Sequence, residues 1–189
     1  MAVIRAGSPD AAAEAARAVI DGGIRIVELR LTVPGANDVI RELSSSFEDA
    51  LVGAGGVVDA HHATLAMEAG AAFVASPGFD AETVQVVSEC EVMMIPGALT
   101  PTEAIRAWHS GCGWVKICPC MGGPEYLRSL KCAVPHARMI PEDGVNLSNA
   151  EAFFRAGASA VAVGEALVES KSVPETARQF VALVKGVRK

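Results

Sequence analysis

Eight short β-branched runs alternate with alanine-rich amphipathic stretches along the 189 residues, and this alternation predicts an α/β fold, a (β/α)8 TIM barrel. Strands separated by helices must pair in parallel, because each helix carries the chain back to the start of the sheet. Glycines recur between a helix and the next strand, as at Gly23, Gly70, Gly111 and Gly157. Since no long linker interrupts the eight units, we predict a single domain over residues 1–189, with an open doubly wound sheet as the alternative.

The predicted strands are short apolar runs, most of which end at a glycine, a proline or a charged residue. In chain order they span residues 3–5, 25–30, 50–54, 72–75, 92–95, 114–117, 138–140 and 160–163. Because the first and the seventh run are short, the open sheet remains the alternative.

The predicted helices are the amphipathic stretches between these strands. They span residues 10–21, 36–45, 59–69, 81–89, 124–131, 148–155 and 174–186, with one more between Thr100 and Gly111. Ser8 and the proline after it form a start signal for the first helix. Thr100 and Glu103 form a capping box, which fixes the start of the helix after the fifth strand.

Composition and charge exclude several classes of protein. A net charge of −6 does not fit the basic surface of a nucleic-acid binder. No apolar run approaches the roughly 20 residues of a membrane span, and the N-terminus enters a strand-like run rather than a signal peptide. Five irregularly spaced cysteines predict reduced thiols in a cytoplasmic protein. Cys118 and Cys120 lack a second ligand pair at a matching spacing, so we expect no metal and no cofactor.

The strand at 114–117 carries a lysine near its end. Alternation places Trp114, Lys116 and Cys118 on one face of this strand and the aliphatic residues between them on the other. If both faces are buried, loss of water lowers the pKa of Lys116 and frees its nitrogen to attack a carbonyl. The alternative is a lysine whose ammonium reaches solvent at the end of the strand.

In a barrel of this kind, chemistry takes place at the carboxyl ends of the strands. Glu28 and Arg30 share the face of the second strand opposite its aliphatic residues, so we expect both to point into the barrel, while Arg5 ends the first strand. Charges inside a barrel are costly, and their convergence with Lys116 therefore indicates a functional site. The alternative is an internal ion pair that only satisfies itself.

An ordered set of motifs runs almost the whole length of the chain. In order they are Val3-Ile4-Arg5, Gly22-Gly23-Ile24, Val27-Glu28-Leu29, Leu51-Val52-Gly53-Ala54-Gly55, Ala69-Gly70-Ala71, Ser76-Pro77-Gly78, Ile95-Pro96-Gly97-Ala98, Thr100-Pro101-Thr102-Glu103, Val115-Lys116, Gly122-Gly123, Ala156-Gly157-Ala158 and Val163-Gly164. With these motifs the chain resembles the 2-keto-3-deoxy-6-phosphogluconate / 4-hydroxy-2-oxoglutarate aldolase family, which are class I, Schiff-base aldolases built on a (β/α)8 barrel.

The resemblance implies that Lys116 forms a Schiff base with pyruvate and that Glu28 transfers protons through water. A protonated imine is an electron sink, so the bond between C3 and C4 of a 4-hydroxy-2-keto acid can break to give an enamine and an aldehyde. The resemblance also implies a homotrimer. It marks Pro77 and Pro96, in the loops after the fourth and fifth strands, as substrate-binding positions.

The chain departs from the family pattern near the keto-acid carboxylate. The family often has Thr two residues after the Glu and Arg four after it, whereas this chain has Arg30 and Thr32. Our hypothesis is that Arg30, with Arg5, binds the carboxylate. A Gly-Thr pair of the family is Gly55-Gly56 here, which removes a hydroxyl, and Cys118 stands where the family has an aromatic residue.

The phosphate site departs further. Where the family has Gly-Gly after strand seven and Gly-Ser after strand eight, this chain has Glu142-Asp143-Gly144 and Gly164-Glu165. Three carboxylates would repel a phosphate dianion, so we expect an unphosphorylated 2-keto-3-deoxy or 4-hydroxy-2-keto acid. The alternative is that these side chains turn outward and the backbone still binds phosphate.

Two other functions use the same residues. Lys116 could decarboxylate oxaloacetate through the same Schiff base, or the chain could be a keto-acid-binding protein that has lost catalysis. Retention of both Lys116 and Glu28 favours an aldolase, because a binding protein has no need of that pair.

Overall fold

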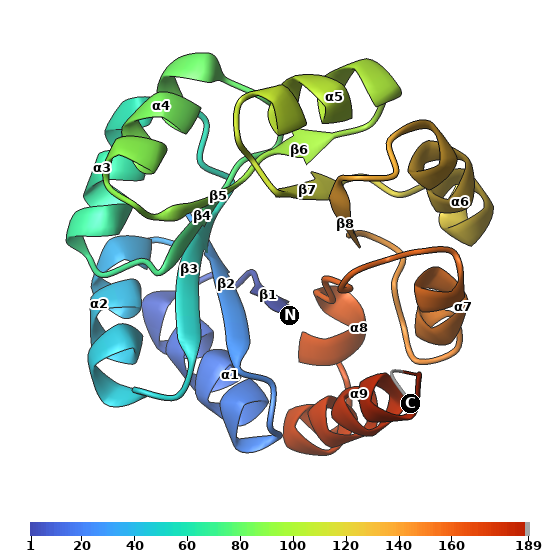
Figure 1. The fold of residues 1–189 in the computed structure, drawn as a ribbon. Coiled ribbons are helices and arrows are strands. Elements are labelled where there is room, and N and C mark those ends of the chain that lie inside the picture. The colour runs from blue at the N-terminus through green and yellow to red at the C-terminus, as the bar shows by residue number, and fades with distance from the viewer. Residues whose placement is uncertain (188–189) are drawn as a thin grey trace.

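The computed structural model describes residues 1–187, and its strands form an inner ring with the helices around the outside (Figure 1). The strands are β1 (Ala2–Ile4), β2 (Ile26–Arg30), β3 (Leu51–Gly55), β4 (Phe73–Ala75), β5 (Met93–Ile95), β6 (Gly97–Ala98), β7 (Trp114–Ile117) and β8 (Arg138–Pro141). All pairs are parallel, in the orders β1-β2-β3-β4-β5 and β6-β7-β8. The predicted (β/α)8 barrel is confirmed.

The helices lie on the outer side of this ring, as the alternation predicted, except for the short helix Glu165–Val168, which lies further in (Figure 1). They are α1 (Pro9–Asp21), α2 (Ala36–Ser46), α3 (Ala60–Glu68), α4 (Ala81–Glu89), α5 (Pro101–His109), α6 (Gly123–Ala133), α7 (Ala150–Arg155), α8 (Glu165–Val168) and α9 (Val173–Val187). The four-residue α8 was not predicted, and the other eight match predicted helices closely. Among residues 1–187 no helix has the length and apolar character needed to cross a membrane.

The prediction of a strand at 160–163 was wrong, although this segment still closes the ring. Only an isolated bridge joins it to β1, with the N–H of Val3 donating to the carbonyl of Val163 at 2.9 Å. On its other side the N–H of Ala162 donates to the carbonyl of Pro141 at 3.0 Å. Proline has no N–H to donate in return, so a regular ladder cannot form with β8.

The fifth position of the barrel is shared by β5 and β6, which Pro96 separates. The carbonyl of Pro96 accepts the N–H of Lys116 at 2.9 Å, so the break does not leave β7 unpaired. A Cβ on Gly97 would lie 2.2 Å from the carbonyl oxygen of Pro77, which explains why glycine follows the proline. The two prolines therefore shape the barrel wall beside Lys116.

The inside of the ring has an apolar part and a charged part. Val3, Ile140 and Trp114 belong to, or pack against, a small interior cluster separate from the main core between strands and helices. Two residues after each of them, on the same face, comes a charged residue: Arg5, Glu142 and Lys116 respectively. The charged residues therefore lie next to the small interior cluster, on the side of the carboxyl ends of the strands.

Candidate active site

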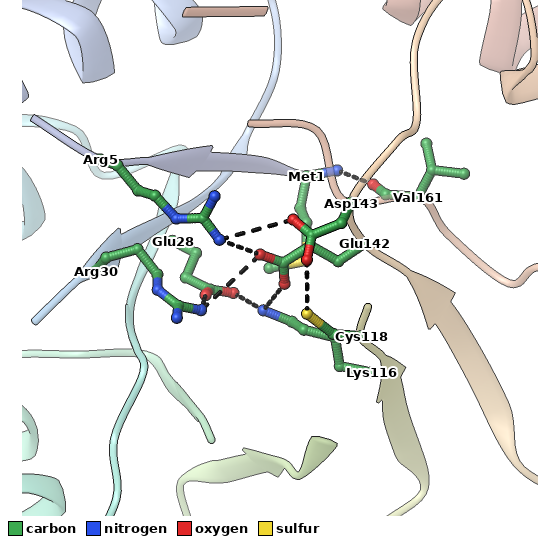
Figure 2. Close-up of polar contacts among 9 residues, drawn as sticks. All are labelled: Met1, Arg5, Glu28, Arg30, Lys116, Cys118, Glu142, Asp143 and Val161. Atoms are coloured by element: carbon green, nitrogen blue, oxygen red, sulfur yellow. Dashed lines mark hydrogen bonds and ion pairs between the residues drawn. The ribbon is translucent and has the colours of Figure 1, made fainter. Parts of the chain in front are cut away.

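Lys116 is among the largest fully buried side chains of residues 1–187, and 2% of its surface is exposed. Its aliphatic neighbours Val115 and Ile117 face the main core, so Lys116 points into the ring as alternation predicted. Figure 2 shows its Nζ between two carboxylates. Nζ contacts Glu28 Oε2 directly and lies 2.9 Å from Glu142 Oε2.

Two arginines complete the arrangement (Figure 2). Arg5 Nη2 lies 3.2 Å from Glu142 Oε1, and Arg30 Nη1 lies 3.6 Å from Glu28 Oε1 and 3.8 Å from Glu142 Oε1. We call the resulting group of three cations and three anions the charged cluster, which consists of Arg5, Glu28, Arg30, Lys116, Glu142 and Asp143. Its formal charges cancel, which is how a barrel interior can hold them.

The pKa of Lys116 moves in the opposite direction to the one that its burial alone predicted. Burial lowers the pKa of Lys116, but the charges and hydrogen bonds of Glu28 and Glu142 outweigh it, and the net pKa is raised. The ammonium is therefore the resting form at neutral pH. A carbonyl can be attacked only after one of the two carboxylates has taken the proton.

Gly55 and Gly56, predicted as substrate-binding positions, lie against the side chains of β2. A Cβ on Gly55 would lie 1.9 Å from Glu28 Oε1, and a Cβ on Gly56 would lie 3.3 Å from the guanidinium of Arg30. Gly56 also has a φ of +72°, which a larger residue rarely adopts. These two glycines make room for Glu28 and Arg30.

Cys118 lies at the mouth of the ring, where its Sγ contacts Asp143 Oδ2 at 3.2 Å. Burial, with the nearby charge of Glu142, raises the pKa of the Cys118 thiol to about 12. Cys118, Glu142 and Asp143 place possible ligand atoms within 4.8 Å of one another. Glu142 already pairs with Lys116, so a metal at this group would have to compete with that ion pair for the carboxylate.

A pocket opens beside the charged cluster at the carboxyl end of the barrel. Its lining includes Arg5, Asp143, Gly144, Gly164 and Glu165. The positions predicted after strands seven and eight therefore meet at one place. Of the three carboxylates that we expected there, Asp143 and Glu165 line the pocket, whereas that of Glu142 turns inward to Lys116.

Pro77, a predicted substrate-binding residue, is exposed and lines a different pocket, with Val57 and Phe79. Thr32 is a second predicted substrate-binding residue that the structure does not bring to this site. It is exposed in the turn after β2, and none of the contacts found among residues 1–187 joins it to the charged cluster. Arg30, two residues earlier on β2, already fills the inward position.

Comparison with known proteins agrees with this geometry. The family model described as "KDPG and KHG aldolase" matches residues 1–183. The chain belongs to this aldolase family. The 2-dehydro-3-deoxy-6-phosphogalactonate aldolase of Escherichia coli strain K12 is 30% identical over 192 residues, covering 100% of this chain and 94% of that protein.

Solved structures of the aldolase family share the fold. A structure described as native KDPGal has a TM-score of 0.91 and 26% identity, covering 99% of this chain and 94% of that one. The KDPG aldolase of Legionella pneumophila has a TM-score of 0.81 and 26% identity, covering 98% and 90%. That enzyme was solved with pyruvate captured as a covalent carbinolamine intermediate.

Glu142 is the residue of the charged cluster that sequence reasoning missed. We had assigned its carboxylate to the phosphate region, but the structure places it against Lys116, with 1% of the residue exposed. Alternation along the strand could have found it, because Ile140 faces the inside of the ring and Glu142, two residues later, shares that face.

The close approach of Gly55 to Glu28 predicts a strong coupling between these positions. Gly55→Ala should lower the free energy of unfolding by about 1–3 kcal/mol, because its Cβ would overlap Glu28. In a Glu28→Ala background the same change should cost nothing, and urea denaturation of the four proteins measures the difference. Gly113→Ala, whose Cβ meets nothing within 4 Å, is the control. Equal costs in both backgrounds would contradict the prediction.

Proposed function

We propose that the protein is a class I aldolase that cleaves a 2-keto-3-deoxy or 4-hydroxy-2-keto acid to pyruvate and an aldehyde. Lys116 would be the nucleophile and Glu28 the general acid and base. The observation that carries this proposal is the contact of a fully buried lysine with a carboxylate at the open end of the barrel. Membership of the aldolase family supports it.

Glu28 would activate Lys116 in this proposal. It would accept the proton of the ammonium, so that Nζ can attack the keto carbon and give a carbinolamine. Return of a proton to the carbinolamine hydroxyl releases water and leaves a protonated imine. The imine then accepts the electron pair of the breaking bond between C3 and C4, and protonation of the enamine leads back to pyruvate.

Arg30 and Arg5 are proposed to bind the carboxylate of the keto acid. The nearest carboxylate oxygens lie 3.6 Å from Arg30 and 3.2 Å from Arg5, and Arg5 is 39% exposed. An anion that enters would gain charge-assisted hydrogen bonds from guanidinium groups that are only partly engaged. This supports a keto acid rather than a simple ketone as the substrate.

The pocket beside the charged cluster is proposed to hold the aldehyde half without a phosphate. Asp143 and Glu165 line it, and within residues 1–187 Arg5 is the one cation of its lining. Since we propose that Arg5 binds the carboxylate of the keto acid, it is not free to bind a phosphate dianion as well. Carboxylates accept hydrogen bonds from hydroxyl groups, which fits a sugar acid that carries no phosphate. Such a substrate belongs to carbohydrate metabolism.

One observation favours the alternative of a keto-acid-binding protein. Two carboxylates hold Lys116 as an ammonium, and an ammonium cannot attack a carbonyl. Borohydride trapping separates the two functions, and product analysis with oxaloacetate separates an aldolase from a decarboxylase.

Borohydride reduction in the presence of pyruvate should add a reduced pyruvate adduct to the protein. We expect intact mass to show one adduct per chain and peptide mapping to place it on Lys116, because reduction captures the imine. Lys116→Ala should give no adduct. A folded wild-type protein without an adduct would remove the aldolase proposal and favour the binding protein.

Cleavage rates should favour unphosphorylated substrates. We expect kcat/KM for 2-keto-3-deoxygluconate, 2-keto-3-deoxygalactonate or 4-hydroxy-2-oxoglutarate to exceed that of the 6-phosphorylated sugar acids by at least tenfold. Glu165→Ser and Asp143→Gly should raise kcat/KM for the phosphorylated acids, because each removes a negative charge from the pocket. A higher kcat/KM of the wild type for a phosphorylated acid would contradict this expectation.

We also propose that the protein is a homotrimer in the cytoplasm. The resemblance to the family supports the trimer, and five free cysteines support a reducing compartment. Light scattering after gel filtration should give three times the chain mass of 19.5 kDa, and a monomer mass would contradict the trimer. Cell fractionation tests the location.

A further inference from the structure

Glu142 is a second carboxylate at the reacting nitrogen, and the proposed function gives it no role. We propose that Glu142 is a catalytic residue of the aldol step, accepting the proton of the C4 hydroxyl while Glu28 carries the proton transfers of imine formation. This inference rests on the proposed function and adds a second carboxylate with a separate task.

The backbone of Glu142 is held on both sides, so its carboxylate has a fixed position. Its N–H donates to the carbonyl of Ile117 at 2.9 Å, and its own carbonyl accepts the N–H of Cys120, also at 2.9 Å. The side chain is buried, and Oε1 contacts Arg5 while Oε2 contacts Lys116. A catalytic carboxylate needs this kind of fixed geometry to reach a reacting atom.

The two carboxylates approach Nζ from different elements (Figure 2). Glu28 extends from β2 and lies against Gly55, whereas Glu142 follows β8, and the next residues, Asp143 and Gly144, line the pocket. If the aldehyde half occupies that pocket, the chain from the imine carbon to C4 must run along the Glu142 side. The C4 hydroxyl, on the second carbon after the imine carbon, then comes within reach of a carboxylate that already touches Nζ.

The charge changes of the reaction suit this division of tasks. A protonated imine keeps a positive charge beside Glu142 until the bond between C3 and C4 breaks. The electron pair of that bond then forms the enamine and neutralises the imine nitrogen. Glu142 then no longer faces a cation at that nitrogen, at the moment when the C4 hydroxyl releases its proton.

The proposed step is balanced. The bond between C3 and C4 breaks, its electron pair forms the double bond between C2 and C3, and the π electrons of the imine return to the nitrogen. C4 and its oxygen form the aldehyde carbonyl, and the hydroxyl proton passes to Glu142. The enamine carbon C3 then takes a proton from solvent, water releases pyruvate from Lys116, and the proton on Glu142 returns to solvent.

Two rates on the same protein separate the tasks of the two carboxylates. Exchange of the methyl protons of pyruvate in D2O requires imine and enamine formation but no C4 hydroxyl. Cleavage requires imine and enamine formation and also the loss of the C4 hydroxyl proton. It is measured with the keto acid that the wild type cleaves fastest. For Glu142→Gln we expect the ratio of cleavage to exchange to fall at least 100-fold, within the range of general-base catalysis.

Glu28→Gln is the matched comparison, because it makes the same change at the other carboxylate that contacts Nζ. We expect it to lower both rates together and leave their ratio within about threefold of the wild type. Glu142→Asp keeps the charge but withdraws the carboxylate by one methylene group, and its ratio should lie between those of the wild type and Glu142→Gln. It also provides the test if Glu142→Gln does not fold, as judged by circular dichroism.

A folded Glu142→Gln protein that keeps the wild-type ratio would overturn the role of Glu142. So would a parallel fall of both rates, which would mean that Glu142 only supports Lys116. These outcomes leave the proposed function intact, because it is tested separately by trapping on Lys116 of the wild type. Failure of that trapping overturns the aldolase itself.

Discussion

The contact of Lys116 with two buried carboxylates is the interaction on which the rest of the structure depends. An ammonium inside a barrel is tolerated only when its charge is compensated, and removing either carboxylate would leave the three cations of the charged cluster with only two anions. Gly55 makes room for Glu28 and Gly56 for Arg30, and the two arginines balance the charge of the carboxylates. The reaction must therefore begin by moving one proton within a set of groups that are already in place.

Most of the fold could be predicted from local pattern. The bounds of β7 were exact, and the inward direction of Glu28, Arg30 and Lys116 followed from alternation alone. The segment at 160–163 was predicted as a strand because its composition is that of one. Its pairing depends instead on Pro141, a neighbour in space that offers no N–H, and strand propensity carries no information about such a neighbour.

The sequence predicts where the site lies in the barrel, but it does not predict which side chains contact one another there. Alternation indicates which side of a strand a residue faces, but the pKa of Lys116 depends on how many carboxylates meet its nitrogen. Glu142 was misjudged because it was compared with a glycine-rich phosphate loop, although Ile140 two residues earlier already fixed its direction. The alternation along β8 therefore predicts the direction of the Glu142 side chain better than the comparison with the family's phosphate loop does.

The space that Gly55 leaves for Glu28 also limits the order in which positions 28 and 55 can be substituted during evolution. If Glu28 were lost first, a glycine inside a strand would be a weak point, and any larger residue there would be favoured for stability. Once such a residue had settled at position 55, the returning glutamate would meet a filled space. Loss of Glu28 would then be difficult to reverse, because restoring it would require two changes in a fixed order.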